Sequence, residues 1–497
     1  MKKLLIGTVV LAGAAAAASP YFFGSQIEKV VQERATWMNK QIEASVKANP
    51  QIEDAKVTVK SYKKGYMNAK SKWILHLALN LPGESAPVVY DIPVNMDITH
   101  GPYLGDAGFG MAKWVARPDL SGLETPEFIK NDTFTSESVI GFAGNMDQQL
   151  VVAPIKHKQD GTTVNFAGAT LTSQSSLSNS LTFTGKMDVQ QLSVSNEGDE
   201  EQFILKPFTM DIEGEGDDKQ MKGSYDAKSS KIEATFGDEA NVIVQSMGLK
   251  GTYEKAKGFD SFIGDTEILL QNITFSGKEV SPEPVKLPEL KFVSTVKQPD
   301  DKHIDITAKY AAKLDPSLMA ALESPINVKA ADLEIQFKGL PTEIVKKYQQ
   351  FIQQVSSEED LSTLDQEMQD ELPVVARMLV NSGFATRVEL HAKSDEGGLN
   401  ADIDLGFKPG LNMSEQDLME LAAMPNPQKV LSMLVGRGHA DLNKSVTDKM
   451  GVTPMLQMMA ADFVSLEGDT FKSDVQIKDG QLLVNGTPLP ISAPPSK

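Results

Sequence analysis

The sequence contains no cysteine, and this absence removes several kinds of chemistry. Without thiols the chain cannot form a disulfide framework, a cysteine-based zinc site or a thiolate nucleophile. An oxidising compartment such as the periplasm is compatible with a chain of this kind, since no thiol is present to be oxidised.

Positive charge is also in deficit, with 48 Lys and Arg residues against 67 Asp and Glu residues and a formal net charge of −19. Such a chain repels a phosphate backbone, so we expect no nucleic acid partner. Aromatic residues make up only 7% of the chain, while small polar residues are frequent, which suits many exposed strands. The 497 residues are enough for two or three structural units with a sizeable core.

Familiar catalytic patterns are missing as well. No serine lies in a Gly-x-Ser-x-Gly elbow, no dinucleotide fingerprint is complete, and the histidines are scattered singly rather than at zinc-ligand spacing. His100, before Gly101 and Pro102, could act as a base or ligand, but an ordinary turn explains it better. Asp402 and Asp404 share one strand face, and a solvated face explains them better than a carboxylate pair. We therefore predict no enzyme and no catalytic, cofactor-binding or metal-binding residues.

A single long apolar run is present, at residues 4–23, where an uncharged stretch follows Lys2 and Lys3. Its length of about 20 residues matches a bilayer core, and aromatic residues at its end suit the interface. We predict a signal anchor at residues 1–24, held in the inner membrane with the remaining chain on the periplasmic side. The anchor residues are Leu4, Leu5, Val9, Val10, Leu11, Tyr21, Phe22 and Phe23. The alternative is cleavage near Ala18, which would leave a soluble periplasmic protein.

Beyond the anchor, hydrophobic periodicity divides the chain into three regions. Apolar residues at three- and four-residue steps predict an amphipathic helix over residues 25–50. Apolar and polar residues then alternate through residues 51–339, which predicts a β-rich periplasmic region. Residues 340–497 mix helical blocks with hairpins, one turning at residues 395–398 and a terminal one at Asp479–Gly480.

The predicted fold is mainly β with inserted α-helices (α+β), beside one N-terminal transmembrane or signal helix. Large twisted antiparallel sheets would be packed by amphipathic helices. Because strands with one apolar face are usually sealed, we expect residues such as Ile306, Ile335 and Ile403 to form a closed core. An open apolar groove is the alternative.

A family resemblance rests on the N-terminal apolar run, the segment 62–66 before a strand and the segment 100–103 at a strand end. In these motifs Tyr62, Gly65, His100, Gly101 and Pro102 resemble the YdgA-like family of bacterial proteins of unknown function. The resemblance spans nearly the whole chain and includes residues 479–481 and 484–486. It implies an inner-membrane-anchored periplasmic protein, with a homodimer as one form, and it brings no catalytic residues.

These observations lead to a ranked set of functions. The first is a non-enzymatic envelope protein, anchored in the inner membrane, whose β-rich body binds a protein partner or an amphiphile. The alternative is a lipid-handling module with an open apolar β-groove, suggested by analogy alone. An envelope hydrolase ranks third.

Overall fold

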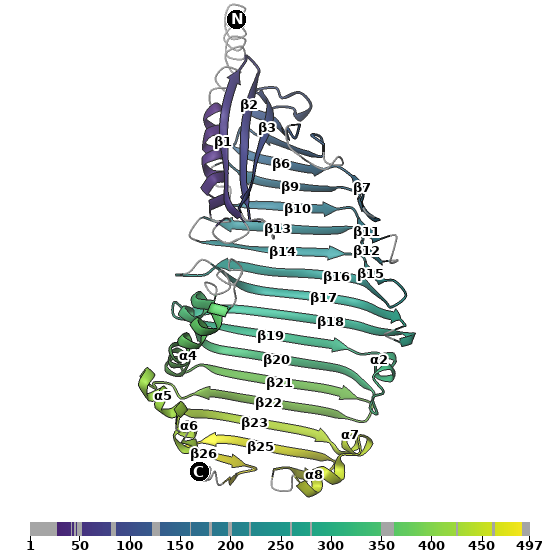
Figure 1. Ribbon diagram of the computed structural model, residues 1–497, viewed down its shortest axis with the longest axis vertical. Coiled ribbons are helices and arrows are strands. Elements are labelled where there is room, and N and C mark those ends of the chain that lie inside the picture. The colour runs from purple at the N-terminus through teal and green to yellow at the C-terminus, as the bar shows by residue number, and fades with distance from the viewer. Residues whose placement is uncertain are drawn as a thin grey trace, which may run out of the picture. The chain divides into compact units, whose positions relative to one another are not determined.

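The computed structural model describes residues 27–489 except 41, 44–45, 47–51, 81–85, 122–129, 160, 178–180, 197–200, 218–219, 259–260, 279–280, 349–361, 424–425 and 460–462 (Figure 1). The chain divides into two compact units. The N-terminal unit comprises Met1–Gly198 with Ile204–Gly223, and the C-terminal unit comprises Asp199–Phe203 with Ser224–Lys497. The division lies inside the region 51–339 that sequence periodicity presents as one β-rich block.

The N-terminal unit is an antiparallel sheet whose strands pair in the order β1-β2-β3-β4-β5-β6-β9-β10-β13, with a second ladder β7-β8-β11. The strands are β1 (Ile52–Lys64), β2 (Asn68–Leu79), β3 (Val88–His100), β4 (Ala112–Pro118), β5 (Phe134–Ile140), β6 (Asn145–Val152), β7 (Ile155–Gln159), β8 (Thr162–Phe166), β9 (Ala169–Ser176), β10 (Phe183–Val189), β11 (Leu192–Asn196) and β13 (Phe208–Gly216). In Figure 1, β1 to β3 run steeply while β9, β10 and β13 lie nearly crosswise, so the sheet twists strongly, as antiparallel sheets do.

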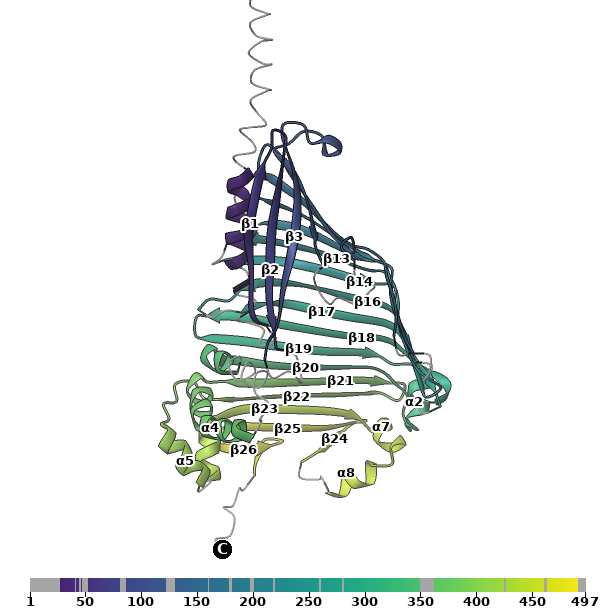
Figure 2. The same ribbon diagram turned by 45° about the horizontal axis from the view of Figure 1, so that its top comes forward.

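A helix described at residues 27–40 packs against this sheet and runs beside β1 (Figure 2). Ile27, Val31 and Ala35 recur every four residues, so they share one helix face, and all three are buried. They join the core cluster of the unit, which β1 to β6 complete. The Asn39 side chain accepts from the Val57 backbone N–H at 2.6 Å and donates to the Val57 carbonyl at 2.8 Å, which fixes the helix along β1.

The C-terminal unit is a long antiparallel meander paired in the order β15-β16-β17-β18-β19-β20-β21-β22-β23-β25-β26-β27, with β24 on β25. Its strands are β15 (Ile232–Phe236), β16 (Ala240–Lys255), β17 (Phe262–Gly277), β18 (Ser281–Asp300), β19 (His303–Lys313), β20 (Val328–Pro341), β21 (Ala385–Ser394), β22 (Gly398–Phe407), β23 (Leu434–Asn443), β24 (Ser465–Glu467), β25 (Thr470–Lys478), β26 (Gln481–Val484) and β27 (Thr487–Pro488). Two further strands, β12 (Glu201–Leu205) and β14 (Met221–Ser229), each include residues of both units.

Both predicted hairpins are present in this unit. Residues 395–397 connect β21 to β22, and Asp479 and Gly480 connect β25 to β26 with positive φ angles of 53° and 76°. Two consecutive positive φ angles are what a tight two-residue hairpin requires, which is why an Asp-Gly pair predicts it. The expectation of a mainly β chain with inserted helices is confirmed.

The helices of the C-terminal unit lie at the ends of its strands (Figure 1). They are α2 (Pro316–Ala321), α4 (Ser362–Ser382), α5 (Glu415–Ala423), α6 (Pro427–Met433), α7 (Lys444–Lys449) and α8 (Thr453–Met459), together with a helix described at residues 342–348. Within the described part of the chain, no helix is long and apolar enough to cross a membrane. The predicted anchor at residues 4–23 lies outside the described residues.

Candidate functional site

The motif residues at the strand ends build a rigid loop region in the N-terminal unit. The His100 backbone N–H donates to the Met67 carbonyl at 3.0 Å, and the Gly101 N–H donates to the Met111 carbonyl at 2.7 Å. A Cβ at Gly101 would lie 2.2 Å from the Gly110 carbonyl oxygen, so only glycine fits there. The peptide bond from Gly101 to Pro102 is cis. His100 is fully buried, so its imidazole is removed from solvent.

Tyr62, near the end of β1, and Gly65, in the turn that follows, lie beside this loop region. Tyr62 packs against the core cluster, and burial, with a smaller effect of Glu28, raises the pKa of its phenol to about 12. The Gly65 N–H donates to the Asn68 carbonyl at 2.6 Å and closes the turn between β1 and β2. The family motif residues therefore shape the end of this sheet. The described residues hold no group of three or more His, Asp and Glu residues arranged to bind a metal ion.

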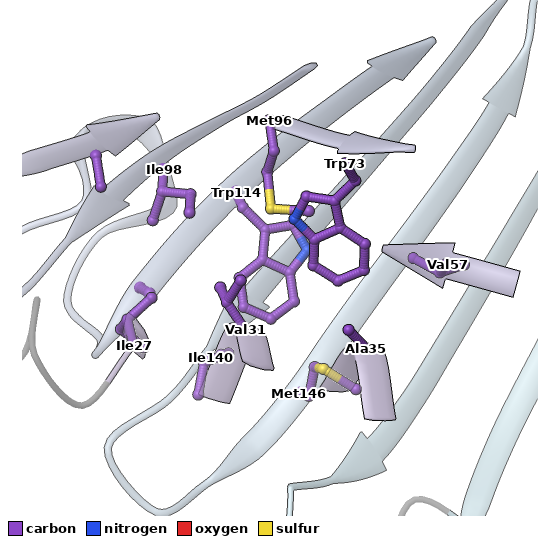
Figure 3. Packing of buried hydrophobic residues seen from close by; sticks show 12 residues of the cluster. Ile27, Val31, Ala35, Val57, Trp73, Met96, Ile98, Trp114, Ile140 and Met146 are labelled. Atoms are coloured by element: carbon purple, nitrogen blue, oxygen red, sulfur yellow. The ribbon is translucent and has the colours of Figure 1, made fainter. Parts of the chain in front are cut away.

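A cavity of about 300 Å³ lies between the N-terminal helix and β1 to β6. Trp73, Trp114 and Met96 line it from the sheet, and Trp37 and Arg34 line it from the helix. Figure 3 shows the indoles of Trp73 and Trp114 next to each other beside the Met96 thioether. The Trp73 indole N–H donates to Ser71 Oγ at 2.9 Å, which satisfies the polar atom of that ring. An apolar cavity with a few polar atoms is the usual form of a small-molecule site.

Arg34 supplies positive charge at this cavity. Its guanidinium lies 4.1 Å from the centroid of the Trp37 ring, a cation–π contact. Burial lowers the pKa of Arg34 from its ordinary value, because removal from water disfavours the charged form. The guanidinium nevertheless remains charged at neutral pH and can receive an anionic group at the cavity wall.

The sheet of the C-terminal unit has two chemically different faces. On one face, many residues are charged, and salt bridges join those on neighbouring strands. Glu267 accepts from Lys291 at 2.9 Å and Lys250 at 3.2 Å, and the Lys291 hydrogen bond is the main reason that the pKa of Glu267 is lowered. Lys309 pairs with Glu334 further along the same face.

The predicted acidic residues Asp402 and Asp404 both lie on this charged face. Asp402 is paired in register with Glu389 and His439, and Asp404 with Arg387 and Arg437. His439 Nδ1 lies 2.8 Å from Asp474 Oδ1 and its Nε2 lies 3.1 Å from Asp441 Oδ2. The hydrogen bond with Asp474, and then that with Asp441, raises the pKa of His439. The surroundings of the two aspartates are those of a solvated ion-pair face.

The opposite face carries continuous apolar rows, because directly paired residues of antiparallel strands point to the same side. Two rows cross nine strands, from β16 to β23 and then β25, without one charged residue. The first row is Leu249, Ile268, Phe292, Tyr310, Leu333, Leu390, Ala401, Ala440 and Ser473, and the second is Met247, Leu270, Leu290, Ala312, Ala331, Ala392, Leu399, Leu442 and Phe471. Ile335, Val388 and Ile403 form a third, shorter row, two residues along β20, β21 and β22 from the first row. We call these three rows the apolar face.

The apolar face is not sealed, which corrects the expectation of a closed core. Phe471 is the only fully buried member of the face, and Ile403 is 57% exposed. Ile306 and Ile335 are also only partly buried. The physical reason is that the described helices lie at the strand ends, as Figure 1 shows, and so leave the middle of the strands without a second layer.

The apolar face is one contiguous patch rather than a scatter of single apolar residues. Nine strands about 4.8 Å apart span about 38 Å, and the two long rows are about 7 Å apart, so with the short third row they outline roughly 300 Å². Isolated apolar residues on a surface are normal, but a contiguous patch of several hundred Å² usually marks an interaction site.

A smaller apolar row lies on the sheet of the N-terminal unit. Leu150, Leu171, Met187 and Met210 are paired in register across β6, β9, β10 and β13. Leu150 is 37% and Leu171 38% exposed. On β6 this face also carries Met146 and Gln148, which contribute to the core cluster and the cavity. The N-terminal helix therefore covers one part of the face and leaves another part open.

The sequence did not predict the cavity, and it indicated the open apolar face only as the alternative to a closed core. Its strand alternation correctly indicates that Leu333 and Ile335 share an apolar side, but alternation does not say whether a second layer covers that side. Trp73 and Trp114 are two of only three tryptophans, and their scarcity is the one signal that could have singled them out.

Comparison with known proteins gives one match. The family model described as "Bacterial protein of unknown function (DUF945)" matches residues 1–492. No curated protein and no solved structure matches the chain.

Proposed function

We propose that this chain, which belongs to the DUF945 family of bacterial proteins of unknown function, is a non-enzymatic protein that binds the hydrocarbon chains of amphiphiles. The observation that carries the proposal is the open apolar face of the C-terminal unit. Removing apolar surface from water lowers the free energy by about 25 cal/mol per Å², so covering this face with hydrocarbon is strongly favourable.

The chemistry of the face favours a hydrocarbon over a protein partner. Its rows contain aliphatic, alanine and aromatic side chains and, apart from Tyr310 and Ser473, no hydrogen-bonding side chain. Protein interfaces rely on aromatic and Arg anchors together with a set of hydrogen bonds, whereas an acyl chain needs none. The apolar face offers aliphatic and aromatic contact area but no arginine and few hydrogen-bonding groups, which suits a surface for hydrocarbon.

In this proposal, the N-terminal segment determines where in the cell envelope the protein is held. The protein is held in the inner membrane by residues 4–23, with both units on the periplasmic side, as the resemblance to the YdgA-like family implies. Amphiphiles would come from that membrane, and the cavity beside Arg34 would suit one with an anionic group. A periplasmic scaffold, whose face is covered by a second copy or another envelope protein, is the competing function.

The test is lipid analysis of the full chain extracted in mild detergent. We expect the wild-type protein to carry phospholipid or another acyl compound after extensive washing. The variant Ile335→Asp/Ile403→Asp should lose most of it, because two carboxylates on the apolar face must remain hydrated.

The matched control is Asp402→Asn. Asp402 is adjacent to Ile403 in the strand but lies on the charged face, so this variant should retain the lipid of the wild type. Circular dichroism verifies that every variant is folded. A wild-type protein that carries no acyl compound, or an Ile335→Asp/Ile403→Asp variant that retains all of it, contradicts the proposal. A dimer that the double variant abolishes, without bound lipid, would support the scaffold.

A further inference from the structure

Three loops meet at one end of the sheet in the N-terminal unit. Residues 65–67 join β1 to β2, residues 101–111 join β3 to β4, and residues 141–144 join β5 to β6. Because antiparallel strands alternate in direction, the turns after β1, β3 and β5 lie at the same end. Backbone hydrogen bonds join the loops, from His100 N–H to Met67 and from Met111 N–H to the Ile140 carbonyl at 2.8 Å. The three loops therefore form one stiff surface.

Large apolar side chains project from each of these loops. Phe109 is 75% exposed, Tyr66 57%, Tyr103 54%, Phe142 53% and Met67 40%. The rings of Tyr103 and Phe109 meet edge to face with centroids 5.6 Å apart. We call these five residues the aromatic tip cluster. Five exposed large residues on three neighbouring loops differ from the single exposed apolar residues of an ordinary surface.

The charge around the aromatic tip cluster differs from that of the whole chain. The net charge is −19, yet Asp106 is the only charged residue within the three loops. Lys113 Nζ binds both oxygens of Asp106, at 2.9 and 3.0 Å, and this hydrogen-bonded lysine lowers the pKa of the Asp106 carboxyl. Lys63 and Lys64 directly precede the first loop. The surface is thus apolar with neighbouring basic residues, a combination that suits anionic lipid headgroups.

The described part of the N-terminal helix starts at this same end, with Ile27. Ile27 belongs to the buried cluster that includes Ile98 and Ile140, which lie just before the second and third loops, and Figure 3 shows these three residues in one region of the core. From Ile27 back to Phe23, where the apolar run ends, is a link of four residues that can reach at most about 14 Å. A membrane that holds residues 4–23 therefore lies close to the aromatic tip cluster.

We propose that the aromatic tip cluster inserts into the headgroup region of a phospholipid bilayer and fixes the orientation of the N-terminal unit on the membrane. Tyr and Phe side chains are favourable at that depth, because their rings leave water while polar groups stay hydrated. The loops act as a second contact beside the N-terminal segment. This contact does not depend on the function proposed for the C-terminal unit.

The absence of native cysteine allows a direct test by spin labelling of the full chain. Single variants Phe109→Cys and Phe142→Cys carry a nitroxide, and the protein is reconstituted in vesicles of phosphatidylethanolamine and phosphatidylglycerol. We expect both labels to collide more often with oxygen, which concentrates in bilayers, than with a water-soluble nickel chelate.

Val89→Cys is the matched control, since Val89 is 55% exposed and lies at the opposite end of β3. Val89 lies eleven residues before His100, so about 36 Å of strand lies between the two. Its label should therefore collide mainly with the nickel chelate. Labels at 109 and 142 that behave like the label at 89 overturn the proposal. Labels shielded from both reagents also overturn it, since they would indicate a protein contact.

Discussion

Ile304 and Ile403 have the same side chain and lie in the same sheet, but in opposite environments. Ile304 is 2% exposed and Ile403 57% exposed. We predict that Ile304→Asp unfolds the C-terminal unit, because an unpaired carboxylate in an apolar interior costs several kcal/mol. Ile403→Asp should change the free energy of unfolding by about 0.5 kcal/mol or less, since its carboxylate stays in water. Denaturant titration of both variants measures this, and unfolding of Ile403→Asp would mean that the apolar face is sealed.

Asp402 gives a second prediction at this scale. It lies on the charged face among Glu389 and His439, so Asp402→Ala should shift the free energy of unfolding by about 0.5 kcal/mol or less, and Asp404→Ala likewise. The melting temperature and the lipid content of each variant are measured and compared with those of the wild type. Loss of lipid binding without loss of stability would reveal a polar site on the charged face and would count against the solvated-face interpretation.

His439 makes stability depend on pH. Asp474 and then Asp441 raise its pKa in the folded protein above the ordinary value of about 6.5. The stabilisation by the protonated imidazole is therefore fully present below pH 6.5 and is lost as the pH rises through the raised value. We expect His439→Gln to melt below the wild type at pH 5.5 and to approach it at pH 9. An equal difference at both pH values would show that protonation is not the cause.

At the scale of elements, the attachment of the N-terminal helix depends on Asn39. Asn39→Ala leaves the Val57 N–H and carbonyl without these partners, which costs about 1–3 kcal/mol. Alanine regains at most about 0.7 kcal/mol of helix propensity, so we predict a net loss of stability. Thr36→Ala, on the exposed side of the same helix, is the control and should leave the melting temperature nearly unchanged. Equal melting of both variants would show that the Asn39 contact contributes nothing.

The elements also show what the sequence can and cannot predict. Period-two alternation predicts strands such as β19 and β20, and Asp479–Gly480 predicts its turn, because both signals are local. The place of α4 to α6 at the strand ends, and with it the exposure of Ile403, depends on contacts between distant segments. Alternation of Leu333 and Ile335 with charged neighbours is the same in a sealed sandwich and in an open sheet. The tip cluster was missed for a related reason, since Tyr66, Phe109 and Phe142 come together only through strand pairing.

At the scale of the whole molecule, three proposed contacts with lipid belong together. Residues 4–23 hold the chain in the inner membrane, the aromatic tip cluster contacts the bilayer surface, and the apolar face of the C-terminal unit receives hydrocarbon chains. The first two contacts would keep the protein at the bilayer surface, and the third would bind hydrocarbon chains of lipids from that bilayer. The hydrocarbon contact is the central claim, and it concerns one face of one sheet.

Photochemical crosslinking in living bacteria tests that claim most directly. Ile403 on the apolar face and Asp402 on the charged face are replaced, one at a time, by p-benzoylphenylalanine in the full chain, and lipids are labelled with radioactive phosphate. Adjacent strand residues point to opposite faces, so the two probes differ only in the side that they sample. Our account predicts phosphate-labelled lipid attached to the chain at position 403 and not at position 402. Equal labelling at both positions, or a protein adduct at 403 without lipid, would contradict it.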